Sequence, residues 1–585
     1  MSEPGSDLSI EQVKALAPGI SLIEAGPGSG KTRTVVARFR QQAAGNRGVA
    51  LFSFTNAAVN VARARCASTP QILDSPDFVG TFDRFFHRYV VTPAEMRAGR
   101  GQPQYFASWD DLPDHLSAVR PSGGGVGVRL CKWLHLGDDI FRLDESKLNH
   151  HEQQMWDNLS PYSQGQIRDL GASRIRSLLG RQIYDTASAR LLAVGYLQAE
   201  SRLTKLALRF KEVIVDEFQD CDVVEHQLLN ALAGAGVHVV AVADPDQAIY
   251  EFRQVGAAAY QRYRATVPAS KTAVLSTCYR STPAICALAT ALRSESASSI
   301  TSHLPATTPC PPIQVVVGTG TRAGAAASKL VSRHQIPYES TRIIAHKRMD
   351  ARALASPGNR AGAGNSTMGQ VIEAVADLIG SVDIRLRRSA MTRLEKAFLG
   401  LVNWPDDGQP DTRQSQLESL GMTEDQLRII ARRIVDSSQG WTDARAATDQ
   451  VRSVVSDASR RLGVSLVPTL GRKLAKPQGS VWAYWLARSA DAPTVVASRI
   501  KWTHVHAVKG DEFDAVIYAL PSRALGGSHV VDDWQNGVGT EARRVLYVGV
   551  TRARSLAILV TPPGRLAQLE QVLRRDGVPY ELTRA

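Results

Sequence analysis

The chain has 585 residues, of which 44% are hydrophobic and 21% are charged, a composition typical of soluble globular proteins with several domains. No run of about 18 apolar residues occurs, and the N-terminus lacks the order of a secretory signal, so we expect a cytoplasmic protein with no membrane span. The six scattered cysteines form no CxxC pair, which argues against a disulfide framework or an iron–sulfur cluster. The formal net charge of +13 fits a nucleic-acid partner, and it fits solubility alone equally well.

Four apolar, β-branched segments in the first half of the chain predict a parallel β-sheet. The first precedes a glycine-rich turn and a helix from about Lys31, and the second precedes a helix near Asn56. The last two end in carboxylates, at the edge of a parallel sheet where ligands bind. The segments are Ile20–Glu24, Val49–Phe54, Glu212–Glu217 and Val237–Asp244.

The rest of the chain predicts a second α/β region and two interruptions. The strand pattern fades between about His87 and Leu203, resumes after Pro283, and is absent again from Asp350 to about Gly479. Apolar segments after Thr494 restore it. We therefore predict an α/β fold with two domains, each carrying a mostly helical insertion. The first domain comprises residues 1–86 and 204–282 with the insertion 87–203, and the second comprises residues 283–349 and 480–585 with the insertion 350–479.

A phosphate-binding loop follows the first predicted strand and opens the first predicted helix. Its glycines let backbone N–H groups surround phosphates, while Lys31 would reach the β- and γ-phosphates and the Thr32 hydroxyl would hold Mg²⁺. The helix that starts there adds its positive N-terminal end. The loop fits the pattern AxxxxGKT with Ala25, Gly26, Pro27, Gly28, Ser29, Gly30, Lys31 and Thr32.

An acidic pair follows the third predicted strand. Asp216 would hold Mg²⁺ through water, and Glu217 would act as the general base that activates the attacking water. A carboxylate pair after a strand is usually a solvated loop, but together with the phosphate loop it predicts an ATP-hydrolysing site. ATP and Mg²⁺ are therefore the expected cofactors.

Further segments resemble, in order, the motifs of superfamily 1 helicases of the UvrD/Rep/PcrA type. DEFQD at 216–220, followed by VADPDQAIYEFR at 242–253, is similar to motifs II and III, and EARRVLYVGVTRAR at 541–554 is similar to motif VI. The resemblance runs from Gln12 to Arg554 and implies two RecA-like P-loop NTPase domains around one ATP site. The other matching segments are Leu51–Val59 (motif Ia), Val79–Arg88 (motif Ib), Leu275–Ser281 (motif IV) and His506–Val516 (motif V).

The resemblance implies roles for residues around the nucleotide. Gln12 would hydrogen-bond the adenine edge, and Tyr279 would stack on the adenine ring. Gln247 would sense the γ-phosphate, and Arg280 and Arg552 would be arginine fingers that bring positive charge to it from the second domain. The predicted nucleotide-binding set also includes Arg33, directly after the loop, and Glu512, which would contact the ribose.

The same resemblance implies a track for single-stranded DNA, along which the protein would move 3′ to 5′. Such a track needs aromatic faces for stacking and contacts to the backbone. Phe252 stands where the family commonly has tryptophan, which leaves a smaller stacking face, and any one of the aromatic residues could pack in the core instead. The predicted DNA contacts are Phe54, Thr55, Asn56, Thr81, Phe82, Tyr250, Phe252 and Arg253.

The chain also departs from the family pattern. His504 stands at the motif V position where the family usually has threonine, and Cys278 replaces the usual asparagine before Tyr279. The segment from Asp350 to Gly479 lacks the glycine- and aromatic-rich signature of the family's second insertion, and the sequence stops soon after motif VI. These departures bear on processive unwinding and on partner contacts, and they leave the predicted ATPase intact.

Two functions stay open from the sequence. The first is an ATP-dependent DNA helicase that translocates 3′ to 5′ and unwinds duplex DNA, in repair, recombination or antiviral defence. The second is a DNA-stimulated ATPase or translocase subunit that regulates or loads a partner nuclease or repair protein and unwinds little by itself. Single-stranded and partially duplex DNA are the expected partners in both, whereas a P-loop ATPase unrelated to nucleic acid is the third alternative.

Overall fold

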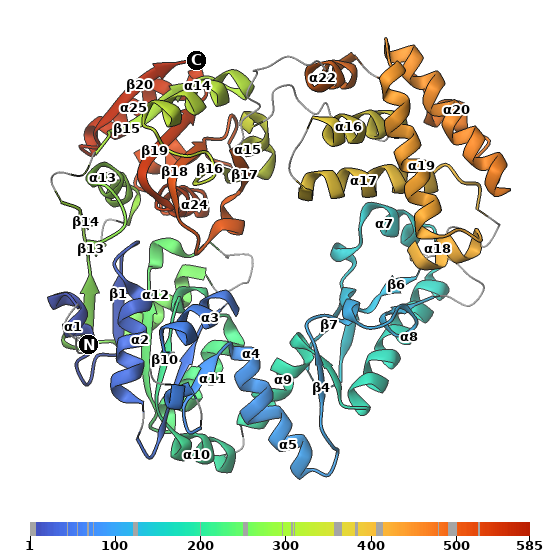
Figure 1. The fold of residues 1–585 in the computed structure, drawn as a ribbon. Helices are drawn as coiled ribbons and strands as arrows, with labels where there is room; N and C mark the ends of the chain where they lie inside the picture. The colour runs from blue at the N-terminus through green and yellow to red at the C-terminus, as the bar shows by residue number, and fades with distance from the viewer. Residues whose placement is uncertain are drawn as a thin grey trace.

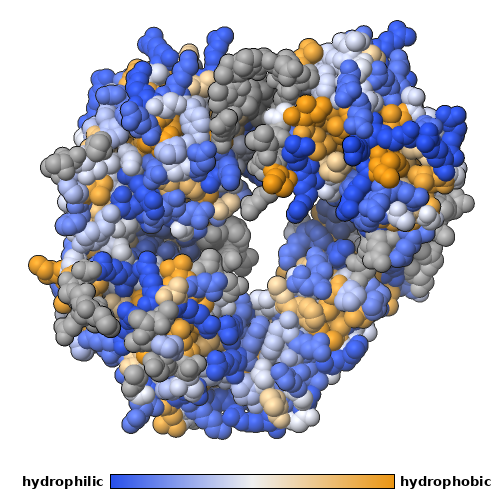
Figure 2. Space-filling view, in the orientation of Figure 1, coloured by the Kyte–Doolittle hydropathy of each residue, from blue (hydrophilic) through white to orange (hydrophobic). Residues whose placement is uncertain are grey.

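Two α/β units and two further regions surround an opening that passes through the centre of the molecule (Figures 1 and 2). The computed structural model describes residues 8–585 apart from 44, 55, 67–69, 74, 121–126, 138, 199, 250–255, 295–296, 306–307, 309, 356–365, 381–383, 405–412, 478, 490–499 and 525–526. The mixed α/β class with parallel sheets is as predicted. Within the residues described, no helix is both long enough and apolar enough to cross a bilayer.

The first α/β unit is built on a six-stranded sheet in the order β12-β1-β11-β10-β2-β3, with every neighbouring pair parallel. The four predicted strands are present, and two short strands that we did not predict, β3 and β12, form the two edges. Its strands are β1 (Leu22–Ala25), β2 (Gly48–Phe52), β3 (Phe78–Gly80), β10 (Phe210–Val215), β11 (His238–Ala243) and β12 (Thr272–Leu275). Its helices are α1 (Ile10–Ala15), α2 (Lys31–Gln42), α3 (Asn56–Arg65), α11 (Val223–Gly234) and α12 (Gly256–Thr266).

A buried ion pair holds the first long helix, α2, against this sheet. Both guanidinium nitrogens of Arg38 that face β10 donate to Glu212, over 2.8 and 2.9 Å, and neither side chain is appreciably exposed. His238 on β11 contacts the same carboxylate, with 3.0 Å between Nδ1 and Oε2. Because a buried pair that loses one partner costs about 3–5 kcal/mol, this contact fixes where α2, and the turn before it, lie on the sheet.

The second α/β unit repeats the plan with a six-stranded sheet in the order β17-β16-β18-β19-β15-β20, again parallel throughout. Its continuous apolar strands are buried, as in sheets that are covered on both faces. The strands are β15 (Ile313–Val317), β16 (Thr341–Ala345), β17 (Lys501–His504), β18 (Phe513–Ala519), β19 (Ala553–Thr561) and β20 (Tyr580–Arg584). The helices are α13 (Pro283–Leu292), α14 (Gly320–Arg333), α15 (Arg348–Ala355), α23 (Val530–Gln535), α24 (Glu541–Val550) and α25 (Leu566–Arg575), and the short strands β13 (Thr277–Cys278) and β14 (Thr301–Ser302) lie between the two units.

The region that follows α15 is helical, as predicted, with its own apolar core. Its boundaries differ from the expected 350–479. Ala351 and Leu354 of α15 pack in the core of the second sheet, whereas Tyr484 and Trp485 of α22 pack in the helical core. The helices are α16 (Thr367–Ile379), α17 (Ile384–Leu399), α18 (Arg413–Ser419), α19 (Glu424–Ser437), α20 (Ala444–Leu462), α21 (Leu470–Lys473) and α22 (Gly479–Ser489).

The region inserted in the first unit is less helical than expected, because it also contains three two-stranded sheets. Helix α9 (Thr186–Leu197) of this region packs with Val90 and Val91 in the core of the first unit. The boundary that we predicted at residue 87 is therefore not sharp. The strands are β4 (Gln104–Phe106), β5 (Ala118–Val119), β6 (Val128–Arg129), β7 (Trp133–His135), β8 (Phe141–Leu143) and β9 (Ile183–Asp185). The helices are α4 (Phe82–Phe85), the π-helix η2 (Phe86–Val91), α5 (Thr92–Arg97), α6 (Asp114–Ser117), α7 (His150–Asp157), α8 (Pro161–Gly180), α9 (Thr186–Leu197) and α10 (Glu200–Arg209).

Candidate nucleotide site between the two α/β units

A cleft of about 1680 Å³ lies where the two α/β units meet, and most of the predicted nucleotide site lines it. Both units contribute, although the residues are separated by up to about 500 positions in the sequence. Three predicted residues do not line it: Gln12, Ala25 and Ser29 are buried behind its wall. The predicted residues that line the cleft are Gly26, Pro27, Gly28, Gly30, Lys31, Thr32, Arg33, Asp216, Glu217, Gln247, Tyr279, Arg280, Glu512 and Arg552.

The turn between β1 and α2 requires glycine at two positions. Gly28 and Gly30 have φ angles of 68° and 80°, in the left-handed region. A Cβ atom on Gly28 would lie 2.7 Å from the Cys278 sulfur, and one on Gly30 would lie 2.5 Å from Gln12 Nε2. These contacts hold the turn closely against Cys278 and Gln12, and its residues line the cleft in front of the N-terminus of α2.

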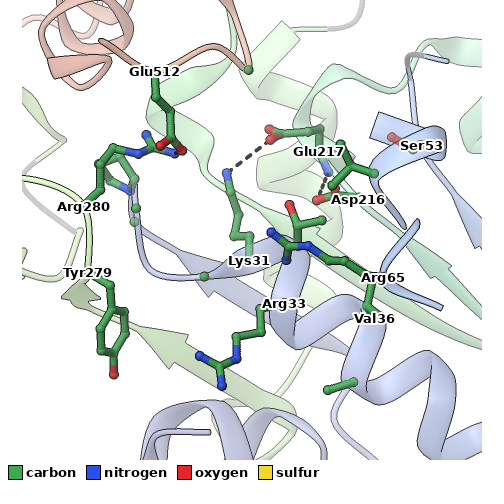
Figure 3. A pocket seen from close by; sticks show the side chains of 18 of the residues that line it. Lys31, Arg33, Val36, Ser53, Arg65, Asp216, Glu217, Tyr279, Arg280 and Glu512 are labelled. Atoms are coloured by element: carbon green, nitrogen blue, oxygen red, sulfur yellow. Dashed lines mark hydrogen bonds and ion pairs between the residues drawn. The ribbon is translucent and has the colours of Figure 1, made fainter. Parts of the chain in front are cut away.

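Lys31 is the first residue of α2, and its side chain points into the cleft toward Glu217 (Figure 3). The Nζ atom lies 3.4 Å from Glu217 Oε1, is buried, and forms no hydrogen bond with the residues that the structure describes. Burial lowers the pKa of Lys31, but the carboxylates of Glu217, Asp244 and Asp216 outweigh it and leave that pKa raised. Lys31 is thus a fixed, poorly solvated cation, as expected of a group that receives phosphate oxygens.

The acidic pair stands at the carboxyl end of β10. Glu217 has a φ of 55°, and its backbone N–H donates to Asp216 Oδ1 over 3.1 Å. Burial, together with the adjacent charge of Glu217, raises the pKa of Asp216. For Glu217 burial acts the same way, but the positive charges of Lys31 and Lys509 prevail and lower its pKa. Glu217 is therefore ionised at neutral pH.

Arg552, at the end of α24, reaches this acidic pair from the second unit. Its side chain is buried, its Nε donates to Val548 O over 3.0 Å, and its Nη2 lies 3.4 Å from Gln247 Oε1. Burial and the nearby charge of Arg280 lower the pKa of Arg552 to about 10, so the guanidinium stays charged at neutral pH. Arg552 and Gln247 thus touch across the cleft, and both side chains lie beside Lys31 and Glu217.

Arg280 and Glu512 form an ion pair at the mouth of the cleft (Figure 3). Arg280 also donates to Thr551 O over 3.2 Å. The other oxygen of Glu512 accepts from Arg554, 3.0 Å from Nη2. Arg554 lines the cleft, and we did not predict it, although the alternation of arginines in VTRAR places it on the same strand end as Arg552.

A second set of contacts across the cleft was also absent from the prediction. Asp244, fully buried, accepts from Gln247 Nε2 over 2.8 Å and from the Tyr547 hydroxyl of the second unit over 2.9 Å. Lys509 pairs with Asp220 and donates to Gln247 O over 3.0 Å. These bonds connect the end of the first sheet directly to α24 and to the turn before β18.

The two residues expected to bind adenine lie in different surroundings. Tyr279 is 38% exposed and lines the cleft, as a stacking residue should. Gln12 is 3% exposed, and its Nε2 donates to Ser29 O over 3.0 Å while its Oε1 accepts from Ser9 N. Both ends of its amide thus have a partner inside the protein, and the predicted contact of Gln12 with adenine stays a prediction. Gln12 supports the back of the phosphate loop.

The predicted DNA contacts are only partly within the described chain. Phe54 is half-buried and lines the cleft. Phe82 is 2% exposed and stacks on Phe52 at 4.5 Å, so the prediction that its ring contacts DNA is not supported: it is a core residue. Thr81 caps α4, and Asn56 begins α3 with its side chain outside the described atoms. The remaining predicted contacts, which lie outside the described residues, are Thr55, Tyr250, Phe252 and Arg253.

Comparison with known proteins agrees with this geometry. The UvrD/REP helicase N-terminal domain matches residues 8–268. This part of the chain is UvrD/Rep-like. This part of the chain carries the phosphate loop, the acidic pair and Gln247, whereas Arg280, Glu512 and Arg552 lie beyond it. Their places in the site therefore rest on the geometry described above.

Three individual relatives each match less than half of this chain. DNA helicase II of Escherichia coli (strain K12) is 28% identical over 293 residues, which cover 46% of this chain and 38% of that protein. ATP-dependent DNA helicase Rep of the same organism is 26% identical over 272 residues, covering 43% and 37%. RecBCD enzyme subunit RecB of Borreliella burgdorferi is 32% identical over 70 residues, covering 12% and 6%. The matches span well under two thirds of each of these relatives.

Proposed function

We propose that the chain is an ATP-dependent DNA helicase that hydrolyses ATP between two RecA-like units and translocates 3′ to 5′ on single-stranded DNA. The observation that carries the proposal is the meeting of both units at one cluster: Arg552 of the second unit contacts Gln247 beside Lys31 and Glu217 of the first. A site completed only when two units meet can convert each hydrolysis event into a relative movement of those units.

The cleft fits Mg²⁺ and ATP. Gly28 and Gly30, with positive φ angles, let the backbone turn tightly in front of α2, and Lys31 Nζ is buried without a hydrogen bond to the described residues. Thr32 and Asp216 would hold the Mg²⁺, which supplies charge neutralisation at the phosphates when bound. Tyr279, exposed at the cleft wall, would stack on the base.

The roles of the charged residues follow from their environment. Glu217, with its pKa lowered by Lys31 and Lys509 despite burial, is ionised and would orient the attacking water. Arg552 and Arg280 would stabilise the charge that develops on the transferred phosphoryl group. Arg280 is paired with Glu512, so we propose that Glu512 positions this arginine at the mouth of the cleft.

The proposal is tested with purified protein, a single-stranded oligonucleotide, and duplexes carrying a 3′ or a 5′ tail. We expect ATP hydrolysis to rise at least several-fold with the single strand, and strand separation only from the 3′-tailed duplex. A hydrolysis rate that single-stranded DNA leaves unchanged would overturn the proposal and would favour a P-loop ATPase that does not act on nucleic acid.

A second candidate is a DNA-stimulated ATPase subunit that regulates or loads a partner nuclease. It is favoured by the match to a relative named as a subunit of the RecBCD enzyme and by the helical region after α15, whose sequence lacks the family signature. DNA-stimulated hydrolysis without strand separation from either duplex would favour this candidate. Repair, recombination and antiviral defence are all compatible with both candidates.

A further inference from the structure

One arginine of the second unit, Arg293, reaches into the turn of the first unit that carries Gln247. Arg293 is the C-terminal cap of α13 and is 7% exposed. Its Nε donates to Asp246 Oδ2 over 2.9 Å, and its Nη2 lies 3.7 Å from Asp244 Oδ1. Both carboxylates belong to the turn after β11, where Asp244 precedes the short helix η7 (Pro245–Gln247). Arg293 does not line the nucleotide cleft, so it faces the site only through these carboxylates.

Asp244 is connected to two of the residues expected to act on ATP. Its Oδ2 accepts from Gln247 Nε2 over 2.8 Å and from the Tyr547 hydroxyl over 2.9 Å. Its backbone N–H donates to Gln219 Oε1 over 3.1 Å, and Gln219 Nε2 donates to Glu217 Oε2 over 2.6 Å. The carboxylate of Asp244 therefore orients the predicted γ-phosphate sensor directly, and its backbone contacts the predicted general base through one amide.

The fully buried carboxylate of Asp244 needs a cation nearby. Its Oδ1 forms no hydrogen bond among the residues that the structure describes, and it pairs with Arg293 Nη2. Burial raises the pKa of Asp244, and Arg293 is the strongest of the groups that oppose this rise. Burial lowers the pKa of Arg293, but Tyr547 and the two carboxylates outweigh burial, so the guanidinium stays charged. Two neighbouring buried carboxylates do not both stay ionised without such a cation.

The second unit holds Arg293 in place through a further arginine, Arg543 of α24. Arg543 Nε donates to Leu292 O over 3.1 Å, and its Nη2 donates to Arg293 O over 2.8 Å. These bonds satisfy carbonyl groups at the end of α13. The Arg293 guanidinium also donates to Ser298 O over 2.7 Å through Nη1. Because α24 leads directly into the segment with Arg552, both arginines approach the first unit together.

We propose that Arg293 is a positioning residue for ATP hydrolysis, which sets the orientation of Gln247 through the two carboxylates of the turn after β11. This inference rests on the proposed function and deepens it. Arg552 brings charge to the phosphate itself, whereas Arg293 acts on the residue that senses the phosphate. Separation of the two units would remove the cation from both carboxylates, so that one of them takes up a proton and the acceptor of Gln247 changes. Gln247 is therefore oriented for hydrolysis only while the units are in contact.

An ion pair that only joins the two units is the alternative explanation of these contacts. Loss of such a pair would lower nucleotide affinity and hydrolysis together, because both depend on the contact between the units. A positioning residue differs, because Gln247 faces the phosphoryl group that reacts. Its misplacement lowers kcat and leaves the affinity for ATP nearly unchanged.

The test compares steady-state ATP hydrolysis, with and without oligo(dT), in the wild-type chain and in Arg293→Met. Methionine keeps a flexible apolar side chain and removes the charge. We expect kcat, expressed per nucleotide-binding site titrated with a fluorescent ATP analogue, to fall about ten- to hundredfold, the cost of a small misplacement near the reacting group. The Kd for the analogue should stay within about threefold of the wild-type value.

Two further variants separate positioning from the loss of a structural contact. Arg293→Lys restores the charge without the planar fork, and we expect it to bring kcat to within about fivefold of the wild type. Asp246→Asn, added to Arg293→Met, leaves Asp244 as the one carboxylate of the pair, and we expect it to raise kcat at least about threefold above Arg293→Met. Arg333→Met removes an exposed arginine in the last turn of α14, and this matched control should leave kcat and Kd unchanged.

A kcat for Arg293→Met within about twofold of the wild type would overturn the proposal, and so would equal losses of kcat and ATP affinity. A loss of kcat that neither Arg293→Lys nor the added Asp246→Asn reverses would also overturn it. If Arg293→Met does not fold, Arg293→Gln keeps a donor for Asp246 without the charge and is judged by the same values. Failure of the proposed function is a separate result, because wild-type hydrolysis would then not rise with oligo(dT), and the variants would be compared by their hydrolysis without DNA.

Discussion

The two α/β units share one sheet plan and differ at the turn after their first strand. In the first unit, β1 leads through the turn from Gly26 to Gly30 into α2, with Lys31 at its start. In the second unit, β15 leads through only Gly318 and Thr319 into α14, and the Ala585 backbone N–H donates to Val317 O beside that turn. A Cβ on Gly318 would lie 3.0 Å from the Ala585 Cβ, so the second turn has no open side.

This difference explains why the two units contribute different groups to the proposed nucleotide site. The first unit offers backbone N–H groups and one buried cation at a long open turn, which suits the phosphates. The second unit has no such turn and contributes long cationic side chains instead, Arg552 from the end of α24 and Lys509 from the turn before β18. The same fold can thus bind a nucleotide or complete a neighbour's site, depending on a few residues after one strand.

The largest effect should come from the first unit's cation. Lys31→Ala removes the buried side-chain cation that faces Glu217 at the start of α2, and we expect ATP hydrolysis to fall by roughly 10³-fold or more. A colorimetric phosphate-release assay measures it. Lys14→Ala, on the exposed side of α1, is the control and should keep normal hydrolysis. Normal turnover in Lys31→Ala would show that the cleft is not the hydrolysis site.

The next largest effect should come from a substitution in the turn between β1 and α2. Gly28→Ala adds a Cβ that meets the Cys278 sulfur and Arg280 Cβ, at a φ of 68°. The strain of about 1–3 kcal/mol should weaken nucleotide binding roughly ten- to a hundredfold, as measured by titration with a fluorescent ATP analogue.

Gly19→Ala is the control that separates the effect of a positive φ from the effect of a close contact with the added Cβ. Gly19 also has a positive φ, of 86°, but no atom lies within 4 Å of an added Cβ. It should lower stability slightly and leave nucleotide affinity unchanged. Equal affinity losses in the two variants would mean that the close contacts at Gly28 are not what weakens nucleotide binding.

A smaller effect is expected for the contact between units. Lys509→Met and Asp220→Asn each remove one partner of a buried pair that crosses the cleft. We expect each to lower kcat by about tenfold and the double variant to be little worse, giving a coupling free energy of about 1–3 kcal/mol. Strictly additive losses in this double-mutant cycle would indicate that the two residues act independently and that the pair does not connect the units.

The smallest effect should come from the exposed rim of the second unit. Glu512→Gln releases Arg280 and Arg554, but the carboxylate is about one third exposed, so the pair is well screened. We expect the KM for ATP to change by less than about fivefold, with kcat within twofold. A loss comparable with that of Lys31→Ala would make Glu512 part of the reaction itself.

The features that could be predicted from the sequence are those that depend on residues close together in the chain. The phosphate loop, the acidic pair and the four buried strands of the first sheet follow from neighbouring residue types. Strands β3 and β12 could not be found, because three or four residues at a sheet edge carry too little pattern. Likewise, the pairing of Asp244 with Tyr547, or of Lys509 with Asp220, joins residues some 300 positions apart.

Two predicted contact residues lie in surroundings that the sequence did not reveal. Gln12 and Phe82 have the residue types that contact nucleotide and DNA, but the fold gives each a partner inside the protein. The amide of Gln12 bonds to Ser29 and Ser9, and the ring of Phe82 stacks on Phe52. A side chain's chemistry shows what it can bind, and only its packing decides whether it is free to do so.

The central claim is that the second unit completes the hydrolysis site of the first. The most direct test is single-turnover ATP hydrolysis by Arg552→Ala, with nucleotide affinity measured separately on the same protein. The account predicts that hydrolysis slows by roughly 10³-fold while the affinity for ATP stays within a few-fold of the wild type. Loss of ATP affinity with unchanged turnover would contradict it.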